Sequence, residues 1–112
     1  MLASYARKDK LRKKIVKLVR DHMGAYLGEF KSGFMPVDSE EHIDLLRKKL
    51  IEEAVEYLQD PSIEELADVY EVLSALAVVD LKVTLEEVLD RANQKSNHRG
   101  GFTIGKALYM EV

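Results

Sequence analysis

The chain has no cysteine, no tryptophan and only two prolines among its 112 residues. Without cysteine, it can form no disulfide, no thiolate metal site and no cysteine nucleophile. Its longest apolar run, Ala75 to Val79, is far too short to cross a bilayer. The basic residues near the start are not followed by the apolar stretch of a secretory signal, so we expect a cytoplasmic protein.

A positive charge excess is also missing, because the net charge is -3. Proteins that bind nucleic acid favour a basic face, so the balance makes nucleic acid an unexpected main partner. A hydrophobic content of 46% and a charged content of 33% are typical of a globular, soluble protein. The length predicts a single domain over residues 1–112.

Hydrophobic periodicity predicts a helical protein. We expect a basic amphipathic helix over residues 4–23 and then a loop with glycine and aromatic residues over 24–37. Capping boxes predict the starts of three more helices, pairing Asp38 with Glu41, Ser62 with Glu65, and Thr84 with Glu87. Pro61 ends the first of these helices and Gly100 the last, and the tail 102–112 is expected to be extended or partly strand.

These elements predict an all-α fold, four-helix bundle-like, with a helix-loop-helix hairpin around residues 59–61 at its centre. Between Leu66 and Val79 the sequence is apolar almost all round the helix. Such a helix lies either centrally in a core or against another subunit. In so short a chain we expect a homo-oligomer, a dimer or tetramer, to complete the bundle.

Two acidic pairs flank the predicted hairpin turn. Carboxylates three residues apart lie on one side of a helix, so the pairs Glu53/Glu56 and Glu65/Asp68 can meet around one point. All four ligands are oxygens and no histidine is suitably placed, which favours Mg²⁺, with Mn²⁺ as the alternative. Asp68 and Glu71 interrupt an apolar helix, where an unpaired carboxylate is costly, so they are expected to have a partner.

Each carboxylate also has an interpretation without metal. Glu65 occupies the third position of a capping box, and Glu53 lies one turn from Lys49. Asp68 could pair with a basic residue of the first helix. Helix geometry, with Leu50 as the core direction, turns Glu52 away from the core.

Several motifs together resemble the all-α NTP pyrophosphatase superfamily, whose members include MazG-like proteins, and in particular its phosphoribosyl-ATP pyrophosphohydrolase-like branch. The metal motif E-E-x-x-E followed by E-x-x-D is similar to Glu52, Glu53, Glu56, Glu65 and Asp68. Residues 17–21 resemble the branch's N-terminal KLVRD, and residues 95–102 resemble its C-terminal K-x-x-x-R-G-G-F. One departure follows KLVRD, where His22-Met-Gly-Ala replaces an Ile-Pro segment.

The resemblance implies a Mg²⁺-dependent nucleotide pyrophosphohydrolase. It would cleave a nucleoside triphosphate or related nucleotide between the α and β phosphates, giving a monophosphate and pyrophosphate. Glu53 or Glu56 would orient the attacking water as general base, in addition to binding metal. Phosphate contacts are expected from Lys17, Arg20, Lys49, Lys95 and Arg99. Gly100 and Gly101 either approach a phosphate through their backbone or end the last helix.

Two other functions stay open on the sequence. The chain could be a non-catalytic helical module that binds nucleotide or serves oligomerisation. It could also bind nucleic acid through the basic residues 7–20, which the net charge disfavours.

Overall fold

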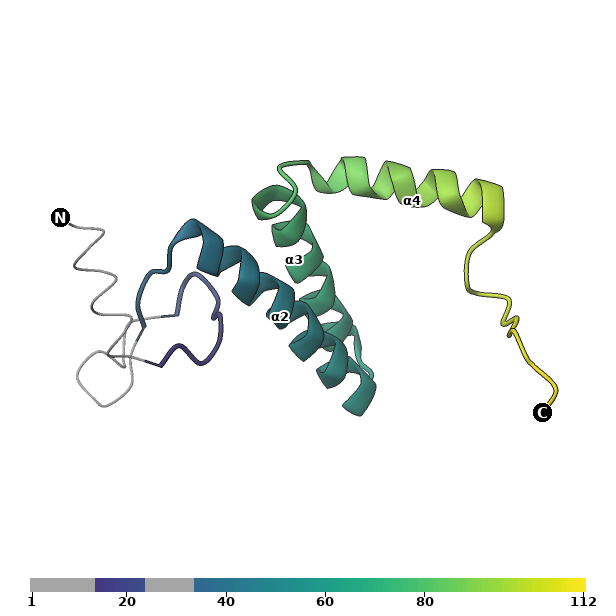
Figure 1. Ribbon diagram of the computed structural model, residues 1–112, viewed down its shortest axis with the longest axis horizontal. Helices are drawn as coiled ribbons and strands as arrows, with labels where there is room; N and C mark the ends of the chain where they lie inside the picture. Colours follow the sequence, from purple (N-terminus) through teal and green to yellow (C-terminus); the bar gives the residue numbers. More distant parts are fainter. Residues whose placement is uncertain (1–13, 24–33) are drawn as a thin grey trace.

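In a computed structural model of the protein, residues 14–23 and 34–112 are described. They form three helices, α2 (Ser39–Gln59), α3 (Ile63–Val79) and α4 (Leu85–Arg99), and contain no strand. The predicted all-α class is therefore confirmed. α2 and α3 form the expected antiparallel hairpin, and α4 leaves the end of α3 that is opposite to the hairpin turn (Figure 1).

Each helix begins at the predicted cap. The Asp38 carboxylate accepts a hydrogen bond from the Glu41 backbone N–H at 2.8 Å. The equivalent bonds to the hydroxyls of Ser62 and Thr84 are both 3.1 Å long. Because these caps satisfy backbone N–H groups that have no partner inside the helix, they fix where each helix starts.

Gly100 ends α4. Its φ of +81° lies in the left-handed region that favours glycine, and its N–H donates to the Ser96 carbonyl at 2.8 Å. Of the two roles considered for this glycine, the structure shows the helix cap. The tail after it, residues 102–112, contains no strand.

The predicted basic helix is wrong where the structure describes it. Residues 14–23, which we call the strap, contain no helix and only a turn at 21–22. Residues 4–13 of that prediction, like residues 24–33 of the predicted loop, lie outside the described residues. Helices gain most of their stability by packing an apolar face. The strap instead contacts the hairpin through ion pairs, Lys17 with Glu52 and Arg20 with Asp68. Such pairs do not require the strap to be helical.

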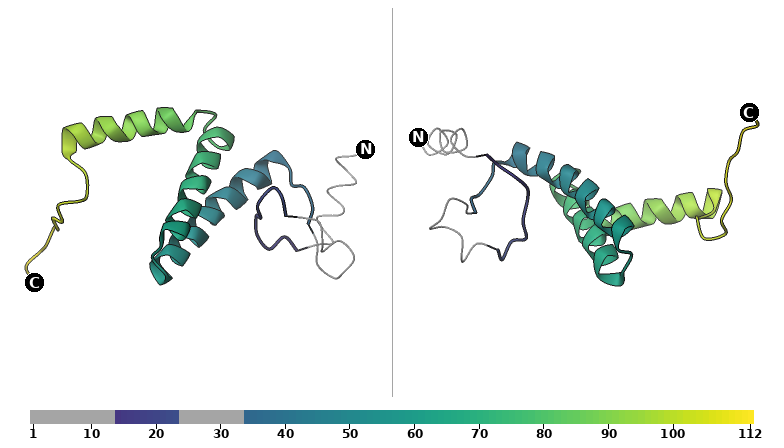
Figure 2. Two further views of the ribbon diagram at one scale, coloured as in Figure 1. Left: turned by 180° about the vertical axis from the view of Figure 1, so that it is seen from behind. Right: turned by 90° about the horizontal axis from the view of Figure 1, so that it is seen from below.

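The described part buries few apolar side chains, namely Leu45, Leu46, Val72 and Ala77 of α2 and α3. α4 contacts α3 but not α2, and none of its residues is buried (Figure 2). Within the part of the chain that the structure describes, α2 and α4 both contact α3, yet Leu66, Tyr70 and Leu73 of this apolar helix are exposed. Among the described residues, no helix combines the length and apolar character needed to cross a membrane.

Candidate metal centre

The two acidic pairs meet at the closed end of the hairpin. One carboxylate oxygen from each of Glu53, Glu56, Glu65 and Asp68 lies within 4.8 Å of the others. The first two residues come from the end of α2 and the last two from the start of α3. The short connection around Pro61 keeps these helix ends together, so the structure brings together all four residues that the spacing predicted. We call them the carboxylate cluster.

Two carboxylate oxygens of the cluster residues are buried and accept no hydrogen bond from the described residues. Glu53 is the most enclosed member, with a side chain that is 9% exposed. Its Oε2 and the Oε2 of Glu65 have no hydrogen-bond partner among the described residues. Burial raises the pKa of Glu53, and the neighbouring Glu56 carboxyl raises it further. Four carboxylates, two of which each have a buried oxygen without a hydrogen-bond partner, fit a hard divalent cation.

Lysines border the carboxylate cluster on the α2 side. The Lys49 ammonium lies 3.4 Å from Glu53 Oε1 and 3.2 Å from Glu52 Oε2, and Lys17 Nζ lies 3.0 Å from Glu52 Oε1. Glu52 was expected to point away from the core, but the structure shows it half-buried between these two cations. Burial alone would raise the pKa of Glu52, yet the hydrogen bonds from Lys17 and Lys49 outweigh it and lower that pKa.

Arg20 of the strap binds α3. Its Nη2 lies 2.5 Å from Asp68 Oδ1 and its Nη1 lies 2.5 Å from Glu71 Oε2. The alternative in which Asp68 pairs with a basic residue from the N-terminal region is therefore observed, although that region is not helical here. The contact also gives Glu71 the partner that its place in an apolar helix suggested.

Lys95 and Arg99 do not join the carboxylate cluster within one chain. Both lie near the end of α4 that points away from the hairpin (Figure 1). The 17 residues of α3 span about 25 Å. α4 starts beyond the far end of that span, so Lys95 and Arg99 lie on a helix that is remote from the four carboxylates of the same chain. Of the expected phosphate-binding residues, only Lys17, Arg20 and Lys49 lie beside the cluster.

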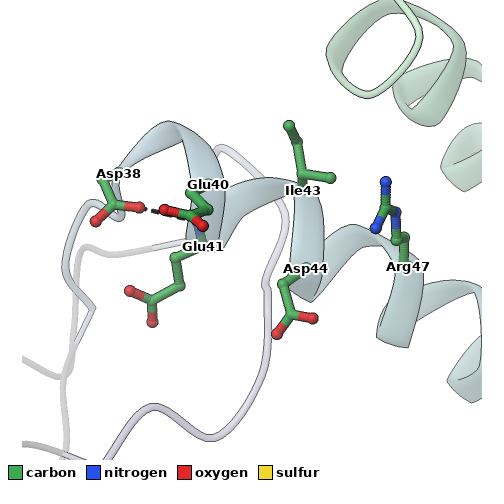
Figure 3. A pocket seen from close by; sticks show the side chains of 6 residues that line it. All are labelled: Asp38, Glu40, Glu41, Ile43, Asp44 and Arg47. Atoms are coloured by element: carbon green, nitrogen blue, oxygen red, sulfur yellow. Dashed lines mark hydrogen bonds between the residues drawn. The ribbon is translucent and has the colours of Figure 1, made fainter.

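Two surface hollows lie near α2. Figure 3 shows the one at its N-terminus, lined by Asp38, Glu40, Glu41, Ile43, Asp44 and Arg47. Four acidic side chains suit an anionic nucleotide poorly, and Arg47 is already paired with Asp80 at 2.8 Å. The second hollow, between the strap and α2, includes Lys17 and Lys49 in its lining but measures only about 110 Å³. Ligand pockets usually measure about 300–1,000 Å³.

No protein-family profile, curated protein or solved structure matches the chain. The family resemblance therefore rests on the motifs in the sequence, and the activity that it implies stays a proposal. The sequence indicated that Glu71, an acidic residue inside an otherwise apolar helix, would have a partner, but it did not identify that partner as Arg20.

Proposed function

We propose that the protein is a cytoplasmic, Mg²⁺-dependent nucleotide pyrophosphohydrolase, with Mn²⁺ as an alternative ion. It would cleave a nucleoside triphosphate or related nucleotide between the α and β phosphates, releasing a monophosphate and pyrophosphate. The observation that carries the proposal is the carboxylate cluster, with its two buried oxygens that lack a donor. The family resemblance supplies the reaction.

The residues around the carboxylate cluster suit distinct roles. A divalent cation held by the four carboxylates would neutralise phosphate charge and polarise the reacting phosphoryl group. Glu53 is the stronger candidate for orienting the attacking water, because it is the most enclosed member of the cluster and its Oε2 has no hydrogen-bond partner among the described residues. Lys17, Arg20 and Lys49 lie beside the cluster and would bind phosphate oxygens through charge-assisted hydrogen bonds.

The proposal includes a homo-oligomer, a dimer or tetramer. On α2, Ile51, Val55 and Leu58 lie at helical spacing and are all exposed, as are Leu66, Tyr70 and Leu73 on α3. Two apolar stripes of this kind, beside so small a core, favour burial against a second copy of the chain. A second copy is also needed if Lys95 and Arg99 are to reach a carboxylate cluster.

A pyrophosphate-release screen tests the activity. Canonical and modified nucleoside triphosphates are incubated with the protein and Mg²⁺ or Mn²⁺, and with a chelator in parallel. At least one nucleotide should release pyrophosphate in a metal-dependent way. Asp68→Asn should lower the rate by at least about 100-fold, since even outer partners of metal ligands cost 10–100-fold.

Asp90→Asn is the matched control, because Asp90 is an exposed acid on α4 outside the carboxylate cluster. That variant should keep the wild-type rate, and circular dichroism should show unchanged helix content in both variants. Full pyrophosphate release by Asp68→Asn would refute the site. The absence of release from every nucleotide would refute the activity.

A second candidate function is a nucleotide-binding module without turnover. It is favoured by the small size of the hollow beside the carboxylate cluster and by the distant position of Lys95 and Arg99. Metal-dependent nucleotide binding in equilibrium dialysis, without pyrophosphate release, would select it over the enzyme.

A further inference from the structure

We propose that Arg20 is an internal counter-ion that competes with a divalent cation for Asp68, so that metal binding releases the strap from α3. This inference rests on the proposed metal site. It concerns a positioning role that Arg20 has before any nucleotide arrives, in addition to a contact with phosphate. The competition implies an order of binding. Metal binds first, and the Arg20 guanidinium that it releases then binds the nucleotide.

The geometry of the contact is that of a cation bound across two carboxylates. The guanidinium places one nitrogen on Asp68 and the other on Glu71, each at 2.5 Å. These acids lie one helical turn apart on α3, so their side chains can converge on the two terminal nitrogens of one arginine. Asp68 is also a member of the carboxylate cluster, so a single side chain is shared between the strap and the proposed metal site.

The inner oxygens of the carboxylate cluster are not in contact with Arg20. Glu53 is more than nine-tenths buried, and its Oε2 has no partner among the described residues. Glu65 Oε2 is in the same state. Arg20 instead binds from the outer edge, through Asp68 and the exposed Glu71. A small divalent ion can reach the inner oxygens, but a guanidinium bound at the edge cannot.

Electrostatic repulsion makes the Arg20 guanidinium and a divalent ion compete for these carboxylates. The four clustered carboxylates and the neighbouring Glu52 and Glu71 are six acidic groups, and the cations of residues 14–23 and 34–112 that contact them are Lys17, Arg20 and Lys49. A divalent ion bound to the inner oxygens would stand a few ångströms from the Arg20 guanidinium. Their repulsion is expected to change the metal-binding constant by about tenfold even at the dielectric constant of water.

Arg20 is free to move when it is displaced. Its side chain is 62% exposed and belongs to a segment without helical hydrogen bonds, so leaving Asp68 breaks two ion pairs and no secondary structure. Exposed ion pairs are individually weak. A cation with several carboxylate ligands therefore displaces the guanidinium more readily than the reverse.

Arg47 provides a matched control. It also forms two hydrogen bonds to a carboxylate, from Nε and Nη2 to Asp80 at 2.8 and 2.9 Å, and its side chain is 65% exposed. Neither Arg47 nor Asp80 belongs to the carboxylate cluster. Removing its charge therefore tests loss of an arginine pair without removing a competitor of the metal.

The experiment measures Mn²⁺ binding to the full chain without nucleotide, by electron paramagnetic resonance of the free ion. We expect Arg20→Gln to bind Mn²⁺ about tenfold more tightly than the wild type and Arg47→Gln to bind with unchanged affinity. Arg20→Lys keeps the charge but loses the two-nitrogen fork, so its affinity should lie between those of the wild type and Arg20→Gln.

A spin label on the strap supplies a readout that a merely structural role would not move. The chain has no cysteine, so a nitroxide on Val16→Cys, at an exposed strap position, reports on the strap alone. Because linkage is reciprocal, Mg²⁺ that weakens the Arg20 contact should raise the mobility of this label when Arg20 is present, and in Arg20→Gln the mobility should be high with or without Mg²⁺. Equal or weaker Mn²⁺ binding by Arg20→Gln, or lower mobility of the strap label with metal, overturns the inference. A wild type that binds no Mn²⁺ overturns the metal site as well, so the two failures are distinguishable.

Discussion

Replacing Glu53 with glutamine should stabilise the protein in the absence of metal and abolish its stabilisation by metal. Glu53 is almost completely buried, and oxygens of three other carboxylates lie within 4.8 Å of one of its own. Two unit charges at that separation repel by about 1 kcal/mol at the dielectric constant of water and by about 3 kcal/mol at an effective value of 20. The substitution removes such repulsions.

One effect reduces the gain. Glu53 loses its contact with Lys49 at 3.4 Å, although the new amide N–H can donate to the neighbouring carboxylates. We therefore expect a net stabilisation of about 1 kcal/mol, which raises the melting temperature by about 4 °C in a domain of this size. Saturating metal reverses the order, because a ligand at 100 times its Kd stabilises the wild type by about 2.7 kcal/mol.

The pH dependence has a definite sign. Burial raises the pKa of Glu53, so the folded protein binds this proton more tightly than the unfolded chain does. The Glu53 contribution therefore lowers stability as the pH rises from the ordinary carboxyl range through the raised pKa. The advantage of Glu53→Gln without metal should be full above that raised pKa and should shrink as the pH falls below it.

Thermal melts followed by circular dichroism, with chelator and with saturating Mg²⁺, give the stability difference without metal and the stabilisation by metal. Repeating the melts in chelator at several pH values gives the pH dependence. Glu64→Gln is the control, because Glu64 is an exposed acid one residue before Glu65 and lies outside the carboxylate cluster. It should respond to metal like the wild type. The reasoning is refuted if Glu53→Gln melts below the wild type in chelator, or if metal raises both melting temperatures equally.

Two further predictions concern the apolar surfaces. Tyr70→Glu, on the exposed stripe of α3, should lower the molar mass found by sedimentation equilibrium, whereas a wild type that sediments as a monomer would contradict the proposed homo-oligomer. Leu46→Ala, at a side chain that is 3% exposed, should lower the free energy of unfolding in urea by about 2–3 kcal/mol. A loss below about 1 kcal/mol would show that this small core contributes little.

The helix starts and the meeting of the carboxylates were predictable because both depend on local sequence. Each cap involves residues three apart, and a short connection sets the hairpin, so neither feature needs information from elsewhere in the chain. The strap differed because its partners lie 35 to 51 residues away in the sequence. Charge pairs over such separations leave no periodic pattern.

The prediction for Glu52 was wrong because the core direction of α2 was taken from the wrong leucine. Leu50 was taken to mark the core direction of α2, but Leu46 is the most buried leucine of that helix. Measured from Leu46 at about 100° per residue, Glu53 lies about 20° away and Glu52 about 120° away. Glu52 therefore lies on the flank where Lys17 of the strap binds it, and not opposite the core. The distance of Lys95 and Arg99 from the carboxylate cluster depends on the direction of α4. No pattern in the local sequence predicted that direction.

All four members of the carboxylate cluster come from one stretch, residues 53–68. Bringing them together closes a loop of about 15 residues, and the entropy of closing a loop grows only slowly with its length. The hairpin can hold the carboxylates together with little help from distant parts of the chain. Changes in the strap, in α4 or on the exposed apolar stripes can therefore alter what binds beside the four acids without separating them.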